Sequence, residues 1–176
     1  MIEDFKPDIV NNLKNPALES AIRAVYFSPS KTNISGFFRV LIESTMVVLT
    51  LSAPKNDDGI NYSDESGFSR FDIGTKIELV QLKDENEELI LPIFTEAKHV
   101  HRVAGLENFH GMAISALNIL EMAIAAKSAK VVFNLGSVEQ LELDRPHMME
   151  IVKQFRNFNL LPNDPIMKNE SSSTQL

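Results

Sequence analysis

The pattern of apolar and polar positions is clearest between residues 89 and 103, and the rest of the chain can be placed around this stretch. Leu89 to Phe94 are apolar almost without a break, which is typical of a strand covered on both faces and therefore placed inside a sheet. Thr95 can cap a helix with its side-chain oxygen, and Glu96 puts a negative charge on the first helical turn. We therefore predict a central strand that leads directly into a helix starting at Thr95.

Apolar residues at helical spacing predict three helices before this strand. They cover residues 9–14, where a turn is the alternative, residues 16–27, and a segment that begins near Ser35 or Gly36 and ends near Thr45. Asn15 followed by Pro16 is typical of a helix start, because a side chain that can cap is followed by a residue whose missing N–H costs nothing at that position. Met46 to Leu51 is predicted to be a strand.

The segment between these strands is polar at first. Residues 52–67 are rich in turn formers and predict a surface loop. Its acidic residues do not follow the EF-hand order, since its glycine is Gly59 and no glutamate closes the loop, so we expect no calcium site. We predict a weak edge strand at 68–73, a strand from Ile77 to Leu82, and an acidic, solvated hairpin tip at 83–88.

The second half of the chain alternates helices and strands. Met112 to Ala126 forms its most apolar segment, and we predict one buried helix there, too short for a bilayer span of about 20 residues. Lys130 to Phe133 is a predicted strand, and residues 134–137 are a predicted turn. A short strand near 141–143 precedes a last helix that begins at Asp144.

These elements predict a single α/β domain (α+β mixed) with a mixed sheet of about four to five strands flanked by helices. We assign residues 1–162 to this domain and residues 163–176 to a disordered polar tail. The tail ends in Thr174-Gln175-Leu176, which fits the pattern of a peptide that adds a strand to a PDZ-type groove. A role of the tail as a secretion signal is also left open.

Charge and composition exclude several classes of function. The formal net charge of −7 and the pI near 5.1 disfavour binding to nucleic acid or to an anionic membrane. The chain has no cysteine, which excludes disulfides, thiol nucleophiles and iron–sulfur clusters. The N-terminal segment is acidic and lacks the apolar stretch of a secretory signal. We therefore expect a cytoplasmic protein.

Motifs for catalysis are absent from the sequence. It contains no G-x-S-x-G, H-E-x-x-H or G-x-x-x-x-G-K-[ST] pattern and no glycine fingerprint after a strand. His99 and His101 are two residues apart, so a helix would place them on nearly opposite faces, where they cannot bind one metal ion together. We interpret them as isolated histidines. The sequence thus predicts no enzyme, no catalytic residue, no metal and no cofactor.

Several stretches in register resemble one known family. FFRVLIESTMVV at 37–48 resembles the FF-R-x-L-x-E-S signature, followed by hydrophobic residues, of the SseB family, named for enhanced serine sensitivity. LPIFT at 91–95 resembles that family's strand ending in P-x-F-T. Met112, the stretch at 120–122 and VVFN at 131–134 resemble its later helix and its strand ending in asparagine. The resemblance extends over residues 9–157.

The resemblance implies the N-terminal domain of that family, an α/β module without a settled biochemical activity. The separate C-terminal domain of longer members is expected to be absent. Leu135 stands where many members have a proline after the asparagine. The resemblance therefore implies a fold rather than a reaction.

Two functions remain open. The first is a non-enzymatic protein-interaction or regulatory module with an unidentified protein partner. The second is the binding of a small, amino-acid-like metabolite where polar residues follow the strands, as ligands do in α/β folds. The candidate ligand-binding residues are Phe94, Thr95, Asn134, Gly136 and Ser137. Self-association of the chain is left open as well.

Overall fold

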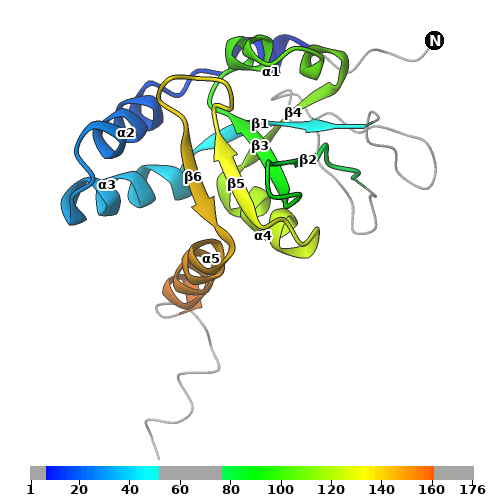
Figure 1. The fold of residues 1–176 in the computed structure, drawn as a ribbon. Coiled ribbons are helices and arrows are strands. Elements are labelled where there is room, and N and C mark those ends of the chain that lie inside the picture. Colours follow the sequence, from blue (N-terminus) through cyan, green and yellow to red (C-terminus); the bar gives the residue numbers. More distant parts are fainter. Residues whose placement is uncertain (1–6, 52–76, 161–176) are drawn as a thin grey trace, which may run out of the picture.

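The computed structural model describes residues 7–51 and 77–160 (Figure 1). The helices are α1 (Pro7–Asn12), α2 (Pro16–Phe27), α3 (Lys31–Ile42), α4 (Ala116–Ala125) and α5 (Arg145–Leu160), with 3-10 helices η1 (Ala97–Arg102) and η2 (Leu106–Asn108). The strands are β1 (Thr45–Thr50), β2 (Leu82–Lys83), β3 (Leu89–Phe94), β4 (His110–Ser115), β5 (Lys130–Phe133) and β6 (Leu141–Asp144).

The strands of this part of the chain form one mixed sheet with β3 at its centre. The order is β4-β1-β3-β5-β6, and β2 pairs with β3 beside this path. β3 and β5 are parallel, whereas the other pairs are antiparallel. The predicted fold class and the central position of the 89–94 strand are confirmed. The sheet has six strands in the described residues, rather than four or five.

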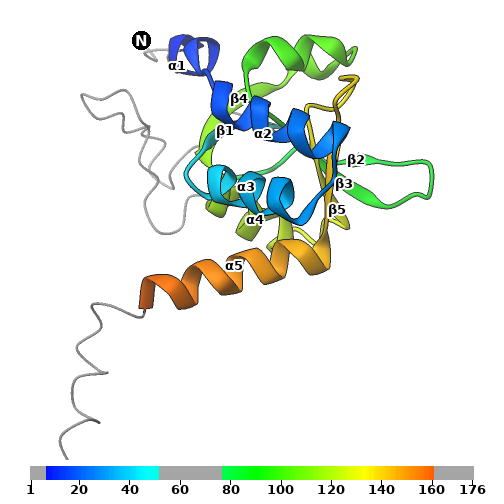
Figure 2. The same ribbon diagram turned by 90° about the vertical axis from the view of Figure 1, so that its left-hand side faces the viewer.

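Each face of the sheet carries its own apolar layer, because successive side chains of a strand point to opposite faces. Met46 and Val48 of β1 pack into the larger layer, which α2, α3, α4 and α5 cover. Val47 and Leu49 point to a smaller layer, which α1, η1 and η2 cover. Figure 2 shows α2 and α3 side by side over the sheet, with α1 above them.

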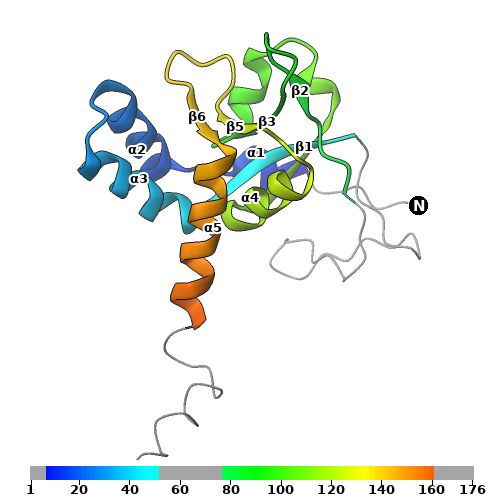
Figure 3. The ribbon, with the colours of Figure 1, turned by 60° about the horizontal axis from the view of Figure 1, so that its bottom comes forward.

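The last helix begins where the sequence predicts. Asp144 Oδ1 accepts a hydrogen bond from the backbone N–H of His147 at 3.0 Å, which caps the first turn of α5. Met148, Ile151 and Val152 pack into the larger layer, and the rest of α5 extends away from the sheet (Figure 3). None of the helices in 7–51 and 77–160 is long and apolar enough to cross a membrane.

Two helix predictions were wrong in their bounds. α3 begins at Lys31, before the predicted start, because Ser30 Oγ accepts from the N–H of Asn33 at 3.1 Å and caps the helix there. The predicted helix at 112–126 is a strand and a helix, since residues 110–115 pair with β1 over its whole length. A short apolar run fits either element, and here strand pairing decides.

The strand predicted from Ile77 to Leu82 is shorter and changes partner. Continuing the β1–β3 register places Leu49 opposite Pro92, which has no N–H to donate. The carbonyl of Leu49 instead accepts from Val80 N–H at 2.8 Å. Only Leu82 and Lys83 form regular pairs, with β3. The acidic hairpin tip after them is confirmed as the connection between β2 and β3.

Other predictions fall on residues that the structure does not describe. These are the loop at 52–67 with its rejected calcium site, the edge strand at 68–73, and the polar tail at 163–176 with its terminal Thr174-Gln175-Leu176 motif.

Candidate functional site

Thr95 lies at the end of β3 and was predicted to cap a helix, but it does not. The cap position of η1 is Glu96, whose backbone is extended and whose side chain makes no capping hydrogen bond. Thr95 is fully buried, and its N–H donates to Asn134 Oδ1 at 2.9 Å. The end of β3 is therefore tied to the end of β5, its parallel neighbour.

Asn134 holds this position through both its backbone and its side chain. Its N–H donates to the carbonyl oxygen of Ile93 at 2.8 Å, which extends the parallel pairing by one residue. Its φ of 51° lies in the left-handed region, which asparagine tolerates better than most residues. Because Oδ1 accepts from a backbone N–H, the orientation of the amide is fixed and Nδ2 points the other way.

Asn15 makes a second polar link at this end of the sheet. It was predicted to cap α2, but its side chain makes no capping hydrogen bond. Nδ2 instead donates to the carbonyl oxygens of Thr45 and Thr95, each at 2.7 Å. It therefore bridges β1 and β3 where their own pairing ends, and fixes the start of α2 against the sheet.

Glu19 of α2 is the acceptor at the centre of the site. Its Oε1 lies 2.8 Å from Thr95 Oγ1 and 2.6 Å from His99 Nε2. The Thr95 hydroxyl also lies 3.1 Å from Asn134 Oδ1, but it has a single proton, and the nearer carboxylate is the stronger acceptor. Burial raises the pKa of Glu19, and the hydrogen bonds from His99 and Thr95 outweigh it, so the pKa is lowered overall.

Glu96 anchors the rim of the site. Its side chain is only 6% exposed and lies 2.8 Å from Lys98 Nζ and 3.0 Å from Lys14 Nζ. Burial raises the pKa of Glu96, but the hydrogen bonds from the two lysines lower it further than burial raises it. The hydrogen bond between Lys98 and Glu96 also raises the pKa of Lys98. Lys98 is thereby held at the rim, 3.8 Å from Glu19 Oε1.

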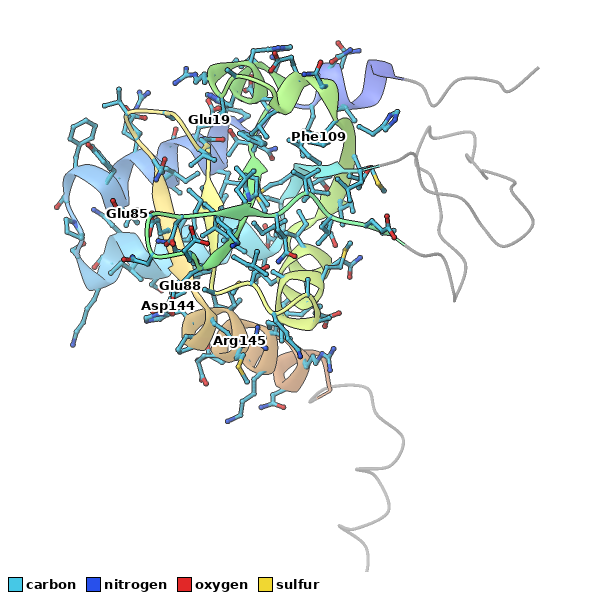
Figure 4. All side chains as sticks on the ribbon, turned by 45° about the vertical axis from the view of Figure 1, so that its right-hand side comes forward. Glu19, Glu85, Glu88, Phe109, Asp144 and Arg145 are labelled. Atoms are coloured by element: carbon cyan, nitrogen blue, oxygen red, sulfur yellow. The ribbon has the colours of Figure 1, made fainter. Side chains whose placement is uncertain are left out.

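A cleft of about 240 Å³ opens above this network, between α2, η1 and the turn that follows β5. The polar residues of its lining are Glu19, Arg23, Lys98, His99, Arg102, Asn134, Ser137 and Glu139. Arg23 Nε is bonded to both carboxylate oxygens of Glu139 at 3.0 and 3.1 Å. Figure 4 shows Glu19 beside η1 at this end of the molecule.

Four groups of the lining have no partner among the residues that the structure describes. They are Glu19 Oε2, Asn134 Nδ2, Ser137 Oγ and the Arg102 guanidinium. The set combines one anionic acceptor, one cationic donor, one neutral donor and one hydroxyl. Such a set fits a small polar ligand that carries both a negative and a positive charge.

The five residues proposed from the sequence lie in different places. Asn134 and Ser137 line the cleft, and Thr95 lies buried directly beneath it. Phe94 is fully buried in the smaller apolar layer and does not reach the cleft. Gly136 has a φ of 80°, and a Cβ there would lie 2.9 Å from Val103 Cγ2. It therefore allows the turn to pack against the end of η1.

Sequence reasoning missed Glu19 and Arg102 and interpreted His99 as isolated. His99 is buried and bonded to Glu19, while its Nδ1 has no partner within the described residues; His101 is exposed. The available signal for Glu19 was its place next to the apolar face of α2, between Leu18 and Ile22.

No cluster of three or more potential metal ligands occurs in residues 7–51 and 77–160.

Comparison with known families gives one match. The family model described as SseB protein N-terminal domain matches residues 18–149. The chain belongs to the SseB family. The matched range begins in α2 and includes every residue that lines the cleft. No curated protein and no solved structure matches the chain.

Proposed function

We propose that this member of the SseB family is a non-enzymatic regulatory module that binds a small, amino-acid-like metabolite in the cleft. The observation that carries the proposal is that Arg102, Asn134 and Glu19 line one cleft, while the Arg102 guanidinium, Asn134 Nδ2 and Glu19 Oε2 have no partner in the described residues. A few convergent polar groups in a concavity are typical of ligand sites.

The position of the cleft supports a ligand site. It lies beyond the carboxyl ends of β3 and β5, which are parallel neighbours in the sheet. Ligands of open α/β sheets bind outside these ends, because the loops that follow the strands form a crevice there. The residues after both strands, Thr95 and Asn134, are locked together beneath the cleft, so its floor is fixed before a ligand arrives.

The charges indicate the chemistry of the ligand. Arg102 can bind a carboxylate through two parallel N–H bonds, and Glu19 Oε2 can accept from an ammonium group. The other charged side chains of the lining are already paired, Arg23 with Glu139 and Lys98 with Glu96. The volume of about 240 Å³ lies below the ~300–1,000 Å³ of sites for drug-sized ligands. A molecule of the size of an amino acid fits these limits.

The same geometry favours binding over conversion. The Thr95 hydroxyl is buried and donates to Glu19, so it is shielded from a ligand. Ser137 has no base bonded to its hydroxyl among the described residues. Glu19 Oε1 and His99 Nε2 are bonded to each other, which commits both groups to holding the site together.

The test is a thermal-shift screen of the full chain with amino acids, followed by calorimetric titration. Each amino acid is compared with the amine and the carboxylic acid that lack one of its two charges. A ligand that binds only the folded chain must raise the melting temperature. We expect an amino acid to bind at least about tenfold more tightly than either analogue, which corresponds to about 1.4 kcal/mol.

Matched variants assign the binding to the cleft. In Arg102→Gln, the amino acid should no longer bind more tightly than the amine that lacks its carboxylate. In Glu19→Gln, the amino acid should no longer bind more tightly than the carboxylic acid that lacks its ammonium group. Arg39→Gln is the control, because Arg39 is an exposed arginine of α3 outside the cleft. Wild-type affinity in Arg102→Gln, or no stabilisation by any amino acid, would contradict the proposal.

A protein-interaction surface is the second candidate. Tyr26 and Phe27 at the end of α2 form an edge-to-face pair with ring centroids 5.1 Å apart, and Phe27 is 69% exposed. Exposed aromatic pairs are enriched in protein interfaces. Cross-linking of the full chain to a captured partner should map to this pair and be lost in Phe27→Ser. Met149→Ser, which changes an exposed apolar residue of α5, is the control.

A further inference from the structure

The two edges of the sheet differ in their protection against pairing with another strand. Within the described residues, β4 pairs with β1 alone and β6 pairs with β5 alone. An edge strand presents a row of unpaired N–H and C=O groups, and proteins usually protect it with charged residues, proline or a bulge. These three devices can be checked on each edge.

β6 is protected and β4 is not. β6 consists of four residues that include Glu142 and Asp144, so a second copy of β6 would meet like charges. The β4 sequence, HGMAIS, contains no acidic residue, lysine, arginine or proline. Its register with β1 runs without interruption from Thr45↔Ser115 to Thr50↔His110, so it contains no bulge.

The register also shows which backbone groups of β4 face outward. The N–H of Ala116 donates to the carbonyl oxygen of Ser44 at 2.9 Å, and this pair continues the β1–β4 register. Hydrogen-bonded and non-bonded pairs alternate in an antiparallel ladder. Met112 and Ile114 therefore direct their N–H and C=O groups to β1. The outward groups belong to Gly111, Ala113 and Ser115.

The outer row is self-complementary about Ala113. Its two neighbours in β4, Met112 and Ile114, are apolar, and the next residues, Gly111 and Ser115, are small. A twofold axis at Ala113 would set Gly111 of one copy opposite Ser115 of the other in a hydrogen-bonded pair. No two charged residues would then face each other along the strand, and each copy would contribute the same patch, as closed dimers require.

α1 does not occupy this row. A Cβ on Gly111 would lie 3.1 Å from Val10 Cγ1, and a Cβ points out of the plane of the sheet. Val10 therefore lies over the face of β4, as its place in the smaller apolar layer also indicates. The outward N–H and C=O groups lie in the plane of the sheet, where α1 makes no hydrogen bond to them within the described residues.

We propose that the chain forms a twofold dimer through antiparallel pairing of β4 about Ala113, which joins two sheets into one. The occupant of the edge is a second copy of this chain, because the outward row is neutral and symmetric about one residue. The dimer leaves the cleft free, since no residue of β4 lines it. It is therefore independent of the metabolite proposal.

The first test is sedimentation velocity of the full chain over a range of concentrations. We expect a concentration-dependent dimer in the wild type and a monomer in Ala113→Pro. This substitution removes an outward N–H and leaves the hydrogen bonds to β1 intact. An edge strand tolerates proline at such a position. Ala113→Ser retains the donor and should dimerise within about threefold of the wild-type Kd, a change below about 0.7 kcal/mol. Circular dichroism checks that each variant is folded.

Hydrogen exchange of the wild type gives a readout that needs no variant. The amides of Gly111, Ala113 and Ser115 should become protected as concentration rises, whereas those of β6 should not change. A monomer at every concentration would overturn the proposal, as would a dimer that persists in folded Ala113→Pro. Protection of the three amides only when another protein is added would assign the edge to a foreign strand and also overturn it.

Discussion

The two ends of the parallel pair β3 and β5 both carry paired charged residues, but they differ in the exposure of their carboxylates. At the carboxyl end, Glu96 is 5% exposed and Thr95 is fully buried. At the amino end, Lys130 Nζ lies 3.1 Å from Asp84, whose side chain is 11% exposed, and 3.0 Å from Glu142, whose side chain is 47% exposed. Figure 4 shows Glu19 at one end of the sheet and Glu85 and Glu88 toward the other.

The difference comes from what covers each end. α2 and η1 close over the carboxyl end and bring Glu19 and His99 within 2.6 Å of each other. The hairpin between β2 and β3 extends from the amino end (Figure 2), so Glu85, Glu87 and Glu88 are exposed to water. Asp84, at the base of the hairpin, is the exception, since its side chain is 11% exposed. Similar side chains thus form a candidate site where helices enclose them and a solvated surface where a hairpin presents them. Charge pairs contribute more to stability where water is excluded.

The largest effect is expected at Asn134. Asn134→Ala removes the acceptor of the buried Thr95 N–H and places alanine at a left-handed φ. The free energy of unfolding should fall by about 2–4 kcal/mol, from the unsatisfied donor and the backbone conformation together. Urea denaturation measures the loss. Glycine at this position tolerates the conformation, so Asn134→Gly separates the two contributions. A loss below about 0.5 kcal/mol for alanine would show that Thr95 finds another acceptor.

An intermediate effect, dependent on pH, is expected at Glu96. The pKa values of Glu96 and Glu19 lie below the ordinary value of 4.5. Their contribution to the free energy of unfolding is therefore present above pH 4.5 and is lost as the pH falls through the lowered values. Glu96→Gln should cost about 1 kcal/mol at neutral pH, since both lysines are exposed enough to return to water.

The same variant should also weaken the dependence of stability on pH below 4.5, the ordinary value for glutamate. Urea midpoints measured from neutral pH into this acidic range give the slope. Glu85→Gln in the exposed hairpin is the control and should leave the slope unchanged. An unchanged acid slope in Glu96→Gln would show that Glu96 does not contribute through its charge.

The smallest effect is expected at the amino end. Lys130→Met removes the pair with the exposed Glu142 and the pair with Asp84. Asp84 keeps its hydrogen bonds from the N–H groups of Asn86 and Glu88. The urea midpoint should fall by less than in Glu96→Gln, and the difference from the wild type should shrink at high salt, because salt screens exposed charges. A loss that matches Asn134→Ala and does not depend on salt would show that the two ends are equivalent.

Much of the fold was predictable because its signals are local. The apolar run at 89–94 identified the central strand, and Asp144 identified the start of α5. The 112–126 stretch was predicted as one helix because its apolar pattern fits both element types. Pairing with β1 made residues 110–115 a strand, and β1 lies far from these residues in the sequence.

The candidate site was predictable only in part. Thr95 and Asn134 were found because polar residues that follow buried strands meet at one edge of a sheet. The roles of Glu19 and His99 were not found, because the two residues are 80 positions apart and neither belongs to a recognisable motif within its own helix. Phe94 was included in the candidate site because it ends the strand, yet alternation along β3 directs it into the smaller apolar layer.

The sequence by itself determined the class of the fold, its family and most of its elements, because periodicity and capping act over a few residues. The tertiary structure decided which polar groups became partners. The capping roles predicted for Asn15 and Thr95 gave way to bonds between distant segments. A buried donor or acceptor binds whatever group the packing brings within reach, and packing depends on the whole chain.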